Sequence, residues 1–87
     1  MQHVNVKFDN VKQVEQFVNM IEKFDAHFDL GCGHKVVNAK SILGVFALDL
    51  TKPLSLCYAS GDAALIEKIT PFLYKGEENP YEMDIAN

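Results

Sequence analysis

Apolar and polar residues alternate in three short stretches of this chain, residues 3–8, 27–32 and 54–58. Alternation is the period of a β-strand with one buried face. The residues that we expect to face the core are Val4, Val6, Phe8, Phe28, Leu30, Cys32, Leu54, Leu56 and Tyr58. A further short strand over residues 35–38 follows Gly33-His34, whose composition predicts a turn, so the second and third strands form a hairpin.

Two longer segments instead repeat apolar residues at steps of three and four, the period of a helix. The first covers residues 10–23, with Asp9 or Asn10 as its N-cap, and its expected buried stripe is Val11, Val14, Val18 and Ile21, widened by Phe17 and Phe24. The second begins after Ser60-Gly61-Asp62. Pro71 lacks a backbone N–H and should kink or end it near Thr70. Its expected buried stripe is Leu65, Ile66, Ile69, Phe72 and Leu73.

Residues 41–48 predict a third, shorter helix with Ser41 as its N-cap. Apolar residues surround its axis almost completely, whereas a short surface helix buries only one stripe against a sheet. If Val45 and Leu48 face the core, Ile42, Leu43 and Phe46 remain as a contact patch for a partner. Gly44 would allow another backbone to approach closely.

The element order β-α-β-β-α-β-α places the two longer helices on one face of a mostly antiparallel, four-stranded sheet. We therefore expect an α+β fold, an open-faced two-layer sandwich, with one core in a single domain over residues 1–74. Residues 75–87 are acidic and lack helical periodicity, which predicts a loosely held segment. Tyr81, Met83 and Ile85 alternate with other residues, which leaves open the alternative that the segment 75–87 docks on the domain.

The formal net charge of -4, with 48% apolar and 23% charged residues, is typical of a folded protein. Nucleic acid and anionic membranes are disfavoured as partners, because the sequence contains no cluster of lysine and arginine. We find no leader segment and no stretch that could span a bilayer, so we expect a cytoplasmic protein. Cys32 and Cys57 are interpreted as reduced thiols in or near the core.

The sequence gives little support for a metal site or a catalytic site. His27 and His34 flank Cys32, but alternation sends His27 and Cys32 to opposite faces of the sheet, so we expect no metal site and no cofactor. No Ser-His-Asp arrangement, glycine-rich phosphate loop or recognisable carboxylate pair is visible. We therefore expect a protein that is not an enzyme.

Residues 37–45 read Val-Asn-Ala-Lys-Ser-Ile-Leu-Gly-Val. This segment resembles, without a gap, the Val-Asn-x-Lys-Ser-Ile-Met-Gly-Val segment of the HPr phosphocarrier domains of the bacterial sugar phosphotransferase system. The resemblance extends in pattern over residues 24–50 and fits the element order through Leu73. In the family this serine is the target of a regulatory kinase, and the short helix behind it docks phosphotransfer partners and a transcription regulator. The resemblance implies regulatory phosphorylation of Ser41, with partner contacts from Lys12, Lys40, Ile42, Leu43, Gly44 and Phe46.

The chain departs from the family at its phosphoacceptor histidine, which lies in a Gly-Leu-His-Ala-Arg-Pro-Ala segment. Gapless alignment puts Asn10 at the histidine, Lys12 at the arginine and Gln13 at the proline. An amide nitrogen has no free lone pair to attack phosphorus, so Asn10 cannot form the phosphoramidate. Lys12 keeps a positive charge but loses the two-pronged contact of arginine.

The expected function is therefore that of a regulatory or binding protein similar to the histidine-less HPr paralogues of Gram-positive bacteria, which act through the serine in carbon catabolite control. Its partners by resemblance are HPr kinase, a transcription regulator or phosphotransferase-system proteins. One alternative is an HPr-shaped module that docks through Ile42, Leu43 and Phe46 without phosphorylation. A weaker one is a phosphocarrier that uses His3, His27 or His34, all expected away from the first helix's N-terminus.

Overall fold

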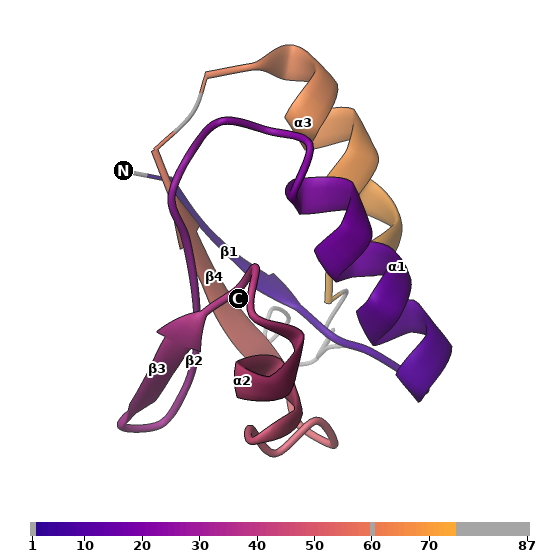
Figure 1. The fold of residues 1–87 in the computed structure, drawn as a ribbon, viewed down its shortest axis with the longest axis vertical. Coiled ribbons are helices and arrows are strands. Elements are labelled where there is room, and N and C mark those ends of the chain that lie inside the picture. The colour runs from indigo at the N-terminus through magenta and orange to yellow at the C-terminus, as the bar shows by residue number, and fades with distance from the viewer. Residues whose placement is uncertain (1, 60, 75–87) are drawn as a thin grey trace, which may run out of the picture.

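Four strands form one antiparallel sheet with the spatial order β1-β4-β2-β3 (Figure 1). The strands are β1 Gln2–Val6, β2 Phe28–Cys32, β3 Lys35–Asn38 and β4 Leu54–Tyr58. The protein is seen here in a computed structural model that describes residues 2–59 and 61–74. The acidic segment expected at residues 75–87, and with it that part of the domain prediction, lies outside the described residues.

Three helices lie on one side of this sheet: α1 Val11–Ile21, α2 Ile42–Phe46 and α3 Ala63–Ile69. A 3-10 turn, η1 Thr70–Phe72, follows α3 directly. Figure 1 shows α1 and α3 next to each other over the sheet, with α2 at the end of the molecule where α1 begins. The predicted α+β open-faced sandwich with its helices on one face is confirmed. None of the helices among the described residues has the length and apolar content to cross a membrane.

The strand register places the predicted inward residues opposite one another. Val6 pairs with Leu54, and Leu56 lies between Val4 and Leu30. All predicted inward residues are buried except Val4 and Cys32, which are half-buried. Phe8 reaches the core from the loop after β1, where its ring centre lies 5.1 Å from that of Phe17 and 5.9 Å from that of Phe72. Aromatic packing thus joins the loop after β1 to α1 and η1.

In each of the two longer helices, one residue that was predicted to be buried is exposed instead. Val11 is 58% exposed, because it is the first residue of α1 and the core-facing stripe starts one turn later, at Val14. Ile66 is 45% exposed, because Leu65 and Ile69 already turn α3 toward the core. Pro71 lies in η1 and α3 ends at Ile69, which confirms the predicted end near Thr70.

Candidate functional site

The helix α2 is five residues long, shorter than predicted, and Ser41 is its N-cap as expected. The Ser41 hydroxyl oxygen accepts a hydrogen bond from the Gly44 N–H at 3.3 Å. Val45 and Leu48 are buried as predicted, but Leu48 reaches the core from the turn after the helix. Because the Ser41 side chain remains exposed, this cap is open to another protein.

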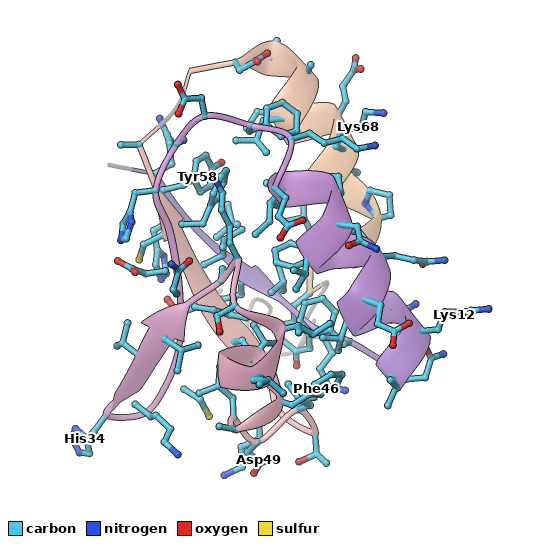
Figure 2. The ribbon with its side chains drawn as sticks, viewed as in Figure 1. Lys12, His34, Phe46, Asp49, Tyr58 and Lys68 are labelled. Carbon is cyan, nitrogen blue, oxygen red and sulfur yellow. The ribbon has the colours of Figure 1, made fainter. Side chains whose placement is uncertain are left out.

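Two of the three residues predicted for the contact patch are exposed. Leu43 is 80% exposed and Phe46, labelled in Figure 2, is 37% exposed. Ile42 is half-buried and packs against the core, so it is less exposed than the sequence predicted. The reason is that a five-residue helix leaning on the sheet turns Ile42 and Val45 inward together. The apolar surface available on α2 is therefore Leu43 and Phe46, which we call the α2 patch.

Two other predicted partner residues have roles inside the protein. A Cβ atom on Gly44 would lie 3.3 Å from the Cβ atom of Val37, so Gly44 lets α2 pack closely on β3. Lys40 is half-buried, and its Nζ atom donates a hydrogen bond to the backbone oxygen of Phe24 at 2.8 Å. Lys12, by contrast, is exposed on α1 and extends into solvent in Figure 2.

Asn10, at the position that resembles the family's histidine, is the N-cap of α1. Its side-chain oxygen accepts a hydrogen bond from the Gln13 N–H at 2.9 Å, while the Gln13 side-chain oxygen accepts one from the Asp9 N–H at 2.7 Å. This pair is a variant of the capping box, in which the Gln13 side chain bonds the N–H of the residue before the N-cap instead of the N-cap N–H; we refer to it below as the capping box. The sequence analysis identified the cap but missed its second half, although Asn followed three residues later by Gln is the signal for it.

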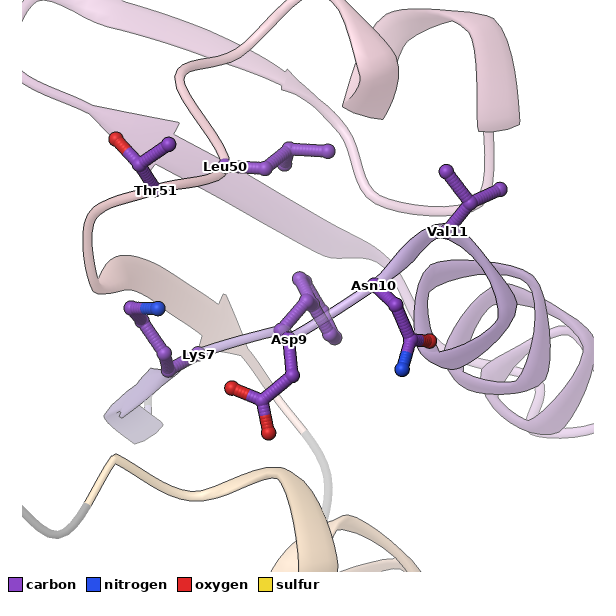
Figure 3. A pocket seen from close by; sticks show the side chains of 7 residues that line it. Lys7, Asp9, Asn10, Val11, Leu50 and Thr51 are labelled. Atoms are coloured by element: carbon purple, nitrogen blue, oxygen red, sulfur yellow. The ribbon is translucent and has the colours of Figure 1, made fainter.

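A pocket of about 350 Å³ lies beside this cap (Figure 3). Its lining residues are Lys7, Phe8, Asp9, Asn10, Val11, Leu50 and Thr51. One lysine and one aspartate cancel in formal charge, so the lining does not favour an anion by net charge. In Figure 3 the side chains of Asp9 and Asn10 point away from Leu50 and Thr51.

The loop after α2 holds a carboxylate whose pKa is shifted. The Thr51 hydroxyl donates to Asp49, and the Thr51 N–H donates to the same oxygen at 3.1 Å. These two hydrogen bonds, with Lys52 Nζ 3.9 Å away, hold the pKa of Asp49 below its ordinary value of 3.8. The charged form of this exposed aspartate is therefore favoured next to α2.

The three histidines lie away from the pocket beside Asn10. His27 Nε2 lies 2.9 Å from Asp29 Oδ1, His3 is hydrogen-bonded to the Ser55 hydroxyl, and His34 is at the tip of the β2–β3 hairpin (Figure 2). Neither Cys32 nor Cys57 forms a disulfide, and both are half-buried. Among residues 2–59 and 61–74, no three side chains of the metal-ligating types come together.

The strand register reveals one arrangement that the sequence analysis missed. His3 lies opposite Cys57, and Cys57 lies opposite Asp29, so these side chains share the sheet face that the helices leave open. Sequence spacing could not show this, because the three residues come from three strands whose order was unknown.

Comparison with known proteins gives one kind of match. No protein-family model matches the chain, and no curated protein sequence does either. The structure is similar to the crystal structure of HPr-C-His from Thermoanaerobacter tengcongensis, with a TM-score of 0.65 and 25% sequence identity. The similarity covers 78% of this chain and 84% of the other.

Proposed function

The chain is an HPr-like protein, and from that premise we propose that it regulates or binds other proteins through Ser41 and α2 without carrying phosphate on a histidine. The fold supports a place among HPr-related proteins of the phosphotransferase system, with protein partners. The proposal assigns it to the cytoplasm and gives it no catalytic role of its own.

The observation that carries the proposal is the capping box of Asn10 and Gln13. A phosphoacceptor at the start of α1 needs a nucleophilic nitrogen and N–H groups that are free to stabilise the transferred phosphoryl group. Here the residue is an amide, and two of the nearby N–H groups already donate to the side chains of Asn10 and Gln13. Asp9 is exposed at the same place and adds a negative charge that repels phosphate.

The α2 region supports the regulatory half of the proposal. Ser41 is exposed to a kinase, and Leu43 and Phe46 offer an apolar surface one turn away. Phosphate on Ser41 would place up to two negative charges beside this patch, enough to strengthen or prevent docking of a partner. By resemblance the partners are HPr kinase, a transcription regulator or other phosphotransferase-system proteins.

A second function keeps the same surface but omits phosphorylation. Exposure of Leu43 and Phe46 favours it, because the α2 patch is present whether or not Ser41 is modified. Phosphate carriage by another histidine is the least supported, since none of His3, His27 and His34 lines the pocket at the start of α1.

Intact mass after two separate incubations tests the proposal. We expect no adduct with enzyme I and phosphoenolpyruvate, and one acid-stable phosphate with HPr kinase and ATP that is absent in Ser41→Ala. No adduct in either incubation would favour the docking module without phosphorylation. An acid-labile adduct with enzyme I would overturn the proposal and support a phosphocarrier.

A further inference from the structure

The side chain of Lys40 turns back into the protein just before the Ser41 cap. Its Nζ atom donates to the backbone oxygen of Phe24 at 2.8 Å and lies 5.4 Å from the centre of the Phe28 ring. Phe24 follows the end of α1, and Phe28 is fully buried at the start of β2. The Lys40 side chain therefore connects the segment just before Ser41 to the loop after α1 and to the start of β2.

The contact suits the charge of the lysine. The Phe24 oxygen lies in the loop after α1, where it also accepts from the Ala26 N–H at 2.9 Å. A hydrogen bond from a charged ammonium group to such an oxygen is stronger than one from a neutral donor. The face of an aromatic ring attracts the same ammonium group. Without Lys40, the Phe24 oxygen would keep the Ala26 N–H as a donor but would lose its bond to the residue before Ser41.

Backbone contacts fix the rest of the same segment. The N–H of Lys40 donates to the Asn38 side chain, and the N–H of Ser41 donates to the Asn38 backbone oxygen, both at 2.9 Å. Ala39 is fully buried, and its N–H donates to the Phe28 oxygen at 2.9 Å. The segment 38–41 is thus held on the β3 side by Asn38 and on the α1 side by Lys40.

We propose that Lys40 is a positioning residue for Ser41: it fixes the start of α2 to the loop after α1 and influences recognition of Ser41 through geometry, without contacting the partner. This differs from the sequence-based expectation that Lys40 binds partners directly. The structural half of the proposal stands alone, and the half about recognition rests on the proposed function.

Amide hydrogen exchange tests the structural half with Lys40→Met, which keeps the length of the side chain and removes its charge. We expect exchange at the Ser41 and Val45 amides to accelerate on the order of tenfold more than exchange at the Leu56 amide of β4, because the loss is local. Lys52→Met is the matched control, since Lys52 is an exposed lysine in the neighbouring loop. Equal acceleration at all three amides in Lys40→Met would overturn the proposal.

Phosphorylation by HPr kinase with ATP tests the half about recognition. If Lys40 acts by positioning, Lys40→Met lowers kcat/KM for Ser41 by the same factor at low and high salt, and Lys40→Arg retains most of it because arginine can still donate to Phe24. If Lys40 contacts an acidic partner, the loss shrinks at high salt, and that outcome would overturn the positioning role. Should the unaltered protein accept no phosphate, the proposed phosphorylation fails, while the exchange experiment still decides the structural role.

Discussion

Gly44 of α2 and Val37 of β3 lie in such close contact that a Cβ atom at position 44 would be 3.3 Å from the Val37 Cβ atom. The same added atom would be 3.3 Å from the Ser41 hydroxyl oxygen. A glycine in the middle of a helix is unfavourable by itself, so its presence here is explained by this packing. Both the position of α2 on the sheet and the Ser41 cap depend on it.

Gly44→Ala should therefore destabilise the protein by about 1 kcal/mol despite the higher helix propensity of alanine, because Val37 or Ser41 must move. Urea denaturation measures the change. Gly31→Ala is the matched control, since its Cβ atom would meet its neighbours at an ordinary 3.4 Å. A Gly44→Ala protein as stable as Gly31→Ala would show that α2 shifts freely on the sheet.

The capping box should appear as a coupling between its two side chains. Asn10→Ala removes the acceptor for the Gln13 N–H and should cost about 1 kcal/mol of unfolding free energy. Gln13→Ala should cost less, because the Asp9 N–H is exposed to water. The double variant should show a coupling of roughly 0.5 kcal/mol or more in a double-mutant cycle. Strict additivity would mean that the two hydrogen bonds form independently.

Asn10→His alone should not restore efficient phosphate transfer from enzyme I. The new ring would be nucleophilic, but phosphoryl transfer depends on positioning and charge stabilisation, and Asp9 remains beside it. Transfer should rise further when Lys12→Arg and Gln13→Pro are added to Asn10→His. The Gln13→Pro change also removes the hydrogen bond from the Asp9 N–H to the Gln13 side chain. Labelling with phosphoenolpyruvate and enzyme I, beside a genuine HPr, measures this. Full-rate labelling of Asn10→His would mean that only the nucleophile is missing.

Substitutions of exposed residues of α2 should mainly affect partner binding, and substitution of a buried residue should mainly affect stability. Phe46→Ala should weaken partner binding by up to about 2 kcal/mol with a smaller loss of stability, and Leu43→Ala should show the same split more clearly because it is more exposed. Val45→Ala, fully buried, should mainly lower stability, by roughly 1–3 kcal/mol. Binding titrations with a phosphotransferase-system partner, beside urea denaturation, measure both effects. Unchanged binding by both exposed-residue variants would place docking elsewhere.

Asp49 should titrate at a lower pH than an unperturbed aspartate, and Thr51→Ala should raise its pKa toward 3.8, because the Thr51 hydroxyl is the largest cause of the shift. Because the pKa of Asp49 is lower in the folded protein than in the unfolded one, its carboxylate stabilises the fold at pH values above the unfolded-state pKa. This contribution is lost as the pH falls through the folded-state pKa. Carboxyl-carbon NMR titration measures the pKa. Lys52→Met should move it less, and a larger shift in that variant would reverse the order of causes.

The sequence predicted the elements with high fidelity where the signal is local. The bounds of β3 and β4 agree with the structure, and Asn10, Ser41 and Asp62 all cap helices. These features follow from alternation, helical period and side chains that bond to nearby backbone, interactions that reach only a few residues along the chain. The order of elements then restricted the fold to a sheet with helices on one face.

Packing between distant segments decided the rest. The sheet order β1-β4-β2-β3 sets the open-face neighbours His3, Cys57 and Asp29, which no spacing in the sequence connects. The family resemblance implied partner contacts from Lys40 and Gly44, but only the structure shows that Lys40 hydrogen-bonds Phe24 and that Gly44 packs against Val37. The physical reason is that a side chain's direction and burial depend on which elements lie beside it, and in this chain those elements are brought together only by the tertiary fold.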